Sequence, residues 1–94
     1  MNNYEVMYIV KPVEEEAFTA LVAKFDDLIV ANGGTIAKTD KWGKKHLAYE
    51  IQNFNDGLYV LTTFQADAKA VKELDRVMKI TDNILRHMII KKEA

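Results

Sequence analysis

Two different spacings of hydrophobic residues alternate along this chain, and their order restricts the fold more than any other feature of the sequence. Residues 4–10 repeat with a period of two and are rich in aromatic and β-branched side chains, which indicates a strand that Pro12 ends. The next hydrophobic residues recur at three- and four-residue spacing, which indicates an amphipathic helix; they are Phe18, Leu21, Val22, Phe25, Leu28 and Ile29. The sequence Asn32-Gly33-Gly34 is a typical end for a helix. The chain is therefore expected to open with a strand followed by a helix.

The next part of the chain predicts two strands joined by a tight turn. Residues 35–51 form an extended segment that is long for a strand, and Gly43 in its middle suggests a bulge or a bend. A cluster of turn-forming residues follows at positions 53–57, and its Asp-Gly pair precedes a second β-rich run over residues 58–66. We therefore expect a hairpin that turns at residues 53–57 and joins two antiparallel strands.

A second helix and a last strand complete the pattern. Asp67 can cap this helix, whose inward face is expected to carry Val71, Leu74 and the pair Val77-Met78. Residues 84–90 read as the final strand. The resulting order is β-α-β-β-α-β, which is the split β-α-β or ferredoxin-like plan. It predicts an α+β fold with a four-stranded antiparallel sheet, in the order 4-1-3-2, and two helices on one face.

Length and composition agree with a single small domain over residues 1–94. Of the 94 residues, 49% are hydrophobic and 29% are charged, and no linker, repeat or low-complexity tract divides them. No apolar run reaches the ~18 residues of a membrane span and the first residues lack a signal-peptide pattern, so we expect a cytoplasmic protein without a membrane partner. The absence of cysteine excludes disulfides and thiolate metal sites, so hydrophobic packing must stabilise the fold.

Nothing in the sequence suggests a catalytic or cofactor site. The chain has no serine, and its threonines have no histidine at a suggestive spacing. Glu14, Glu15 and Glu16 are better interpreted as acidic residues at a helix start than as metal ligands, because neighbouring helical residues point about 100° apart. His87 is interpreted as a packed or edge histidine of the last strand. We therefore expect no enzymatic activity, no metal, no cofactor and no small-molecule substrate.

The charged residues are segregated along the chain, although its net charge is only −1. Residues 13–31 are acidic overall, whereas residues 38–46 and residues 86–94 are basic. In the predicted strand order, the two basic segments lie on the two edge strands of the sheet. Such a molecule can contact a polyanion despite its nearly neutral net charge.

The basic segment with the most distinctive chemistry surrounds Trp42. Lys41, Lys44 and Lys45 flank the tryptophan and the glycine beside it. Cations can contact phosphates and a flat ring can contact a base or a sugar, so this combination favours a nucleic-acid surface. Two simpler explanations stay open: edge-strand lysines that prevent aggregation, and a Trp42 ring folded over the end of the sheet.

Base stacking on the open face of the sheet, as in the RNA recognition motif, is a weaker hypothesis. Tyr4 and Tyr8 share one face of the first strand with Val6 and Val10, so we expect them to face the helices. The opposite face carries Glu5, whose charge would not attract phosphates.

Three segments of the chain together resemble the bacterial small-subunit ribosomal protein S6 family. They are the opening YEVMYIVKP, the segment WGKKHLAYEI that starts at Trp42, and the closing DNILRHMIIKK. The resemblance covers nearly the whole chain. It implies a ferredoxin-like, non-enzymatic protein of the small ribosomal subunit that binds 16S ribosomal RNA together with ribosomal protein S18.

The resemblance also implies which residues neutralise RNA phosphates, namely Lys44, Lys45, Arg86, Lys91 and Lys92. Trp42, which we expect from its own chemistry to pack on RNA or the partner, completes the set of candidate RNA-binding residues. The chain departs from the family pattern at Asn2 and Asn3, where many members are basic, and at Glu50, where proline is frequent.

A protein partner is expected because this chain alone should bind RNA weakly. The salt slope, which is the change in the logarithm of the binding constant with the logarithm of the salt concentration, would be only roughly −3 to −4 for four phosphate contacts. Leu47 and Tyr49 on the long edge strand are the candidate partner-binding residues, through strand addition or apolar packing. Tyr49 as a residue of the core is an equally good interpretation. The alternative function is a ferredoxin-like regulatory or oligomerisation module that binds no RNA and pairs its sheet edges with copies of itself.

Overall fold

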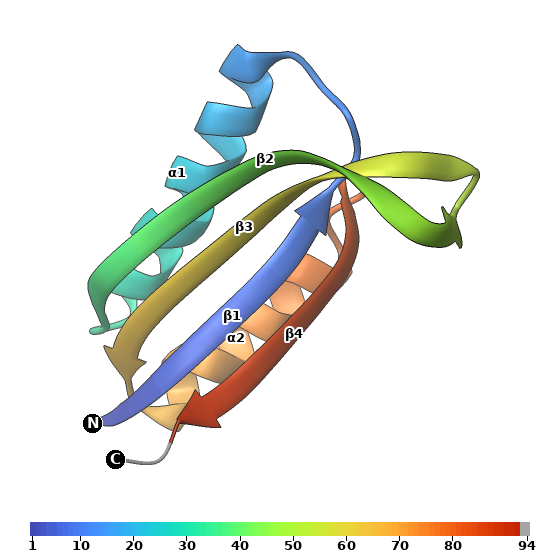
Figure 1. The fold of residues 1–94 in the computed structure, drawn as a ribbon. Helices are drawn as coiled ribbons and strands as arrows, with labels where there is room; N and C mark the ends of the chain where they lie inside the picture. The colour runs from blue at the N-terminus through green and yellow to red at the C-terminus, as the bar shows by residue number, and fades with distance from the viewer. Residues whose placement is uncertain (93–94) are drawn as a thin grey trace.

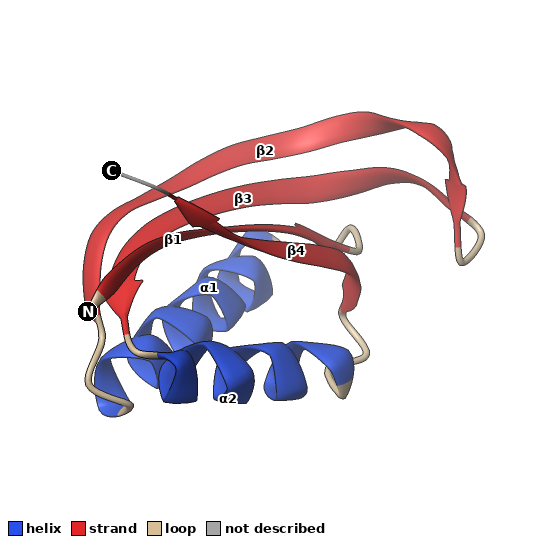
Figure 2. Ribbon diagram, turned by 90° about the horizontal axis from the view of Figure 1, so that it is seen from below, coloured by secondary structure: helices blue, strands red, loops and turns tan. Residues whose placement is uncertain are grey.

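The structure, a computed structural model, describes residues 1–92 and contains the six elements in the expected order (Figure 1). They are β1 (Asn2–Val10), α1 (Glu15–Ala31), β2 (Thr35–Ile51), β3 (Phe54–Ala66), α2 (Ala68–Lys79) and β4 (Ile84–Lys92). The strands form one sheet in the order β2-β3-β1-β4, and every neighbouring pair is antiparallel. Both helices cover the same face of this sheet (Figure 2). The predicted α+β ferredoxin-like fold and its strand order are therefore confirmed.

The main hydrophobic core lies between the helices and the sheet. The rings of Tyr8 and Phe25 meet edge to face in this core, with their centroids 5.4 Å apart. Ala70 is buried on the inward face of α2, and Val71 and Val77 lie half-buried at its borders. Every second residue of β1 is buried here, as a strand period of two predicts. The buried residues of β1, α1 and α2 in this core are Tyr4, Val6, Tyr8, Val10, Phe18, Val22, Phe25, Ile29, Ala70, Leu74 and Met78.

The turn of the β2–β3 hairpin is earlier and shorter than the sequence predicts. Ile51 pairs with Phe54, so the turn consists only of Gln52 and Asn53. Both turn residues have positive φ, 49° and 70°. Two successive residues of this kind characterise a type I′ turn, whose twist matches that of the strands it joins. The prediction of a turn at residues 53–57 is therefore wrong, because its Asp-Gly pair lies within β3.

Gly57 lies in the middle of a strand because a neighbouring strand leaves no room for a side chain there. A Cβ atom on Gly57 would lie 2.3 Å from Cγ2 of Ile9 on β1. This is far inside van der Waals contact, so the close approach of β1 requires glycine at this position.

Replacing Gly57 with alanine should reduce the free energy of unfolding by about 1–3 kcal/mol, because Ile9 would have to move within its packed cluster. Urea-induced unfolding measures the change. Asn55→Ala, at an exposed position of the same strand, is the control and should change stability by less than about 0.5 kcal/mol. Equal stability of the two variants would contradict a steric role for Gly57.

Asp26 of α1 links the helix layer to β2. Oγ1 of Thr39 donates a hydrogen bond of 3.1 Å to Oδ2 of Asp26. Burial raises the pKa of the Asp26 carboxyl above its usual value, and the hydrogen bond from Thr39 opposes this only in part. The folded state consequently favours the protonated form of Asp26.

We therefore expect Asp26→Asn to increase the free energy of unfolding at pH 7 by about 0.5 kcal/mol. This value allows for solvent screening, because the carboxyl is partly exposed. Because the folded pKa is raised, the stabilising contribution of the protonated carboxyl is present at acidic pH and is lost as the pH rises through that pKa. The stability gained by Asp26→Asn should accordingly disappear at about pH 3, where the Asp26 carboxyl is protonated in both the folded and the unfolded state. Urea unfolding of Asp26→Asn and of the wild type at the two pH values measures the difference in stability. An equal gain in stability at both pH values would contradict a raised pKa of Asp26 in the folded state.

Candidate nucleic-acid interface

The β2–β3 hairpin projects beyond the rest of the sheet. Val10, the last residue of β1, pairs with Leu58, and Leu58 pairs on its other side with Lys44. Residues 45–57 consequently have no pairing partner on β1, and Figure 1 shows this part of the hairpin as a twisted arm that passes the end of β1. The arm, residues 45–57, therefore extends the sheet beyond its two shorter strands.

The irregularity expected at Gly43 is a β-bulge at the base of the arm. The pairing register with β3 shifts between Lys41 and Gly43, so Trp42 has no partner on β3. Gly43 has a φ of 81°, in the left-handed region that favours glycine. Trp42 is 49% exposed and belongs to neither of the hydrophobic clusters formed by the described residues. Its ring is therefore accessible to a base, a sugar or a partner side chain.

Asp56 on β3 forms ion pairs with some of the cations near the bulge and so determines which of them are free to contact a phosphate. Nζ of Lys44 lies 3.7 Å from Oδ2 of Asp56, and Nδ1 of His46 lies 3.2 Å from Oδ1. Lys41 and Lys45 form no ion pair within the described part of the chain. Of the two lysines predicted to bind RNA here, Lys45 is therefore available, whereas Lys44 must exchange a carboxylate for a phosphate.

Arg86 of β4 and Tyr49 of β2 meet, although their strands are opposite edges of the sheet. Nη1 of Arg86 donates a hydrogen bond of 2.9 Å to the hydroxyl of Tyr49. The twist of the arm brings β2 back toward the start of β4 to make this contact (Figure 1). Tyr49 is 64% exposed, so its interpretation as a core residue is wrong.

Leu47, the other candidate partner-binding residue, is only 4% exposed. It packs against Ile9 and Leu85 in a second, smaller cluster, which holds the base of the arm. Leu47 can therefore support a surface formed by Tyr49 but offers little contact area of its own.

Lys91 and Lys92 lie at the other end of β4 from Arg86. Six positions separate Arg86 from Lys92, which corresponds to about 20 Å along a strand. Nζ of Lys92 is 3.4 Å from a carboxylate oxygen of Glu5, whereas Lys91 forms no ion pair with a described residue. The structure therefore places the candidate RNA-binding residues in two separate groups, one around the base of the arm and one at the C-terminal end of β4.

A third group of cations, on α2, is missing from the sequence-based prediction. Its members are three, four and three positions apart and follow one side of the helix: Lys69, Lys72, Arg76 and Lys79. Arg76 pairs with Glu73, and Nζ of Lys79 lies 2.9 Å from Oδ2 of Asp75. The helical spacing is visible in the sequence, but only the fold places Lys72 beside the edge strand β4.

Within residues 1–92, no three His, Asp or Glu side chains are grouped so that they could hold a metal ion. None of the helices there combines the length and the apolar character that crossing a membrane requires.

Comparisons with known proteins lead to one family. The model of the family described as "Ribosomal protein S6" matches residues 3–91. The small ribosomal subunit protein bS6 of Desulforamulus reducens is 58% identical over 92 residues, which are 97% of each chain. The crystal structure of 30S ribosomal protein S6 from Thermotoga maritima superimposes with a TM-score of 0.93 at 32% identity, over 97% of this chain and 87% of that one.

A more distant likeness concerns the fold alone. The solution structure of the C-terminal domain of the MgtC protein from Mycobacterium tuberculosis superimposes with a TM-score of 0.69 at 12% identity, over 99% of this chain and 89% of that one. Such a likeness shows how widely the fold is used and carries no information about function.

The family match and the bS6 relative both extend over nearly the whole chain. They confirm the resemblance seen in three segments of the sequence. The chain belongs to the ribosomal protein S6 family, whose members are structural, non-enzymatic proteins of the small ribosomal subunit.

Proposed function

We propose that this chain binds 16S ribosomal RNA together with ribosomal protein S18. Membership of the S6 family supports a structural role in the small ribosomal subunit, which operates in the cytoplasm as part of the ribosome. The observation that carries the RNA-binding proposal is the bulge at the base of the arm, which leaves the ring of Trp42 uncovered beside Lys44 and Lys45.

The exposed groups near the bulge match the chemistry of RNA. Lys45 can neutralise a phosphate without first breaking an ion pair, and an aromatic ring such as that of Trp42 contributes about 1–3 kcal/mol when a base stacks on it. Arg86 lies at the same end of the sheet, whereas Lys91 and Lys92 supply a second contact about 20 Å away along β4.

The outer edge of β2 and the ring of Tyr49 are the proposed contacts with S18. β2 is an edge strand, so its outer backbone groups have no strand partner within the described sheet and can pair with another chain. The exposed ring of Tyr49 would add apolar area beside this edge. A second protein would also bring cations to an arm whose own charge Asp56 partly neutralises.

The alternative of a self-associating module that binds no RNA is less well supported. Its partner surface would be the same outer edge of β2, but the family match favours the ribosome. Sedimentation of the isolated chain distinguishes the two, because the module requires a stable homodimer.

The double variant Lys44→Ala/Lys45→Ala should bind ribosomal RNA in the presence of S18 with a salt slope reduced by about two, because each lysine contributes one phosphate contact. Fluorescence anisotropy with labelled RNA at several salt concentrations measures the slope. Lys24→Ala, which removes a single cation of α1, is a control for the loss of positive charge elsewhere and should keep the wild-type slope. An unchanged slope in the double variant would identify both lysines as solvated edge charges.

Asp56→Asn should strengthen binding to the same RNA by up to about fivefold, because Lys44 then no longer leaves a carboxylate to reach a phosphate. The limit follows from the energy of an exposed ion pair, which is at most about 1 kcal/mol. Asp27→Asn changes the net charge equally but on α1, and should have a smaller effect in the same anisotropy assay. An equal gain in both variants would attribute the effect to overall charge and contradict local competition by Asp56.

A further inference from the structure

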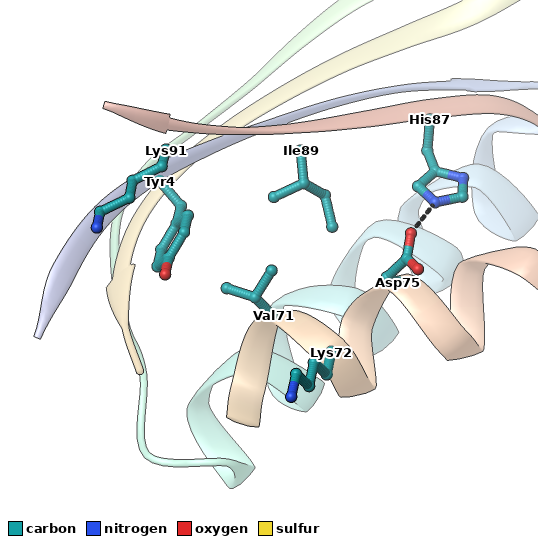
Figure 3. A pocket seen from close by; sticks show the side chains of 7 residues that line it. All are labelled: Tyr4, Val71, Lys72, Asp75, His87, Ile89 and Lys91. Carbon is teal, nitrogen blue, oxygen red and sulfur yellow. Dashed lines mark hydrogen bonds and ion pairs between the residues drawn. The ribbon is translucent and has the colours of Figure 1, made fainter. Parts of the chain in front are cut away.

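A groove lies between α2 and the edge strand β4, on the helix side of the sheet. Its apolar wall is formed by Val71 of α2, Ile89 of β4 and Tyr4 of β1 (Figure 3). The groove has a volume of about 350 Å³, which is within the range of small-molecule sites. The groove can therefore hold one small molecule or one unit of a polymer.

Two lysines line the groove from opposite sides, Lys72 on α2 and Lys91 on β4 (Figure 3). Neither forms an ion pair with another described residue. Glu5, whose carboxylate Lys92 engages, lies on the opposite face of β1 and does not line the groove. The groove therefore presents positive charge that the described part of the chain leaves uncompensated.

The carboxylate that lines the groove, that of Asp75, is already neutralised. Its Oδ1 lies 2.7 Å from Nε2 of His87, and its Oδ2 lies 2.9 Å from Nζ of Lys79. These contacts, that of His87 first, hold the pKa of Asp75 below its usual value, so the carboxylate stays ionised and paired. An anion that enters the groove would thus not meet an unpaired negative charge.

We propose that this groove binds a single nucleotide, with its phosphate between Lys72 and Lys91 and its sugar and base along the apolar wall. Lysine ammonium groups bind phosphate as point charges, and a nucleobase has a flat, largely apolar face that such a wall can cover. That the nucleotide belongs to an RNA chain rests on the proposed function. The preference of the groove for a nucleotide rests on its own residues.

An acidic protein segment is the competing occupant, because a carboxylate can also pair with Lys72 or Lys91. Aspartate and glutamate side chains have little apolar surface, however, and would leave the wall largely uncovered. The paired side chains of His87 and Asp75 also place polar atoms where the edge of a base could meet them. The combination of two cations, an apolar wall and a polar end favours the nucleotide.

Nuclear magnetic resonance of the isolated full-length chain tests the groove in the absence of ribosomal RNA and S18. Uridine 5′-monophosphate should shift the methyl resonances of Val71 and Ile89, with a dissociation constant on the order of 1 mM. Uridine, which lacks the phosphate, and inorganic phosphate, which lacks the base, should each bind at least about tenfold more weakly. Equal binding of inorganic phosphate and the nucleotide, or no shift at either residue, would overturn the proposal.

Substitutions at the groove test the placement of the phosphate. Lys72→Gln and Lys91→Gln should each weaken nucleotide binding by about three- to tenfold, whereas Lys24→Gln on α1 should leave it unchanged. Asp75→Asn should strengthen binding, because it removes a negative charge beside the phosphate and releases Lys79. Weaker binding by Asp75→Asn, in a variant whose spectrum is otherwise native, would mean that the Asp75 carboxylate itself contributes to binding and would overturn this placement of the phosphate.

A second experiment identifies the source of the nucleotide. Lys72→Gln should reduce the salt slope of binding to ribosomal RNA with S18 by about one. A wild-type slope, together with mononucleotide binding, would overturn the assignment to RNA in favour of a free nucleotide.

A tetraglutamate peptide that shifts the resonances of Val71 and Ile89 at lower concentration than the nucleotide would overturn the proposal in favour of an acidic protein segment. Failure of the wild-type chain to bind RNA would refute the proposed function alone, because the mononucleotide titration reports on the groove independently.

Discussion

The structure depends on the burial of one face of β1 beneath the two helices. β1 lies between β3 and β4 in the sheet, and its helix-facing residues belong to the main core. Because the chain has no cysteine, burial of apolar surface is the main source of its stability. A slip of one residue would turn the buried face outward, so this burial also sets the pairing register of the two strands beside β1. The register in turn determines which residues lie on the sheet edges and which lie beyond the sheet.

The unequal lengths of the strands create the candidate interface. β2 has 17 residues and β3 has 13, whereas β1 and β4 have nine each. The hairpin therefore continues where its neighbours stop, and antiparallel pairing at its base and beside its turn holds it while several of its side chains, such as that of Tyr49, remain exposed. A bulge at the base of this arm leaves Trp42 unpaired and exposed, and the contact between Tyr49 and Arg86 ties the arm to β4. The surface proposed for RNA and S18 is thus a consequence of the sheet geometry.

Local ion pairs decide which cations of a nearly neutral chain are available to a polyanion. Acidic neighbours engage some of the cations, namely Lys44, Lys79 and Lys92, whereas others have no such partner among the described residues, namely Lys45, Lys72 and Lys91. Exposed pairs of this kind are weak, so a phosphate can displace the carboxylate at little cost. Counting charges along the sequence cannot separate the two sets, because the carboxylate that engages a lysine comes from another strand or another turn of a helix.

The sequence by itself determined the six elements, their order and the presence of basic residues on both edge strands, because hydrophobic periodicity and charge are properties of neighbouring residues. It also located the bulge at Gly43. Only the tertiary structure decided that Gly57 serves close packing against Ile9 and does not form a turn. The contact between Tyr49 and Arg86 and the groove between α2 and β4 were likewise decided only by the tertiary structure. These features depend on the twist of the sheet and on packing between segments far apart in the chain, which no local pattern encodes.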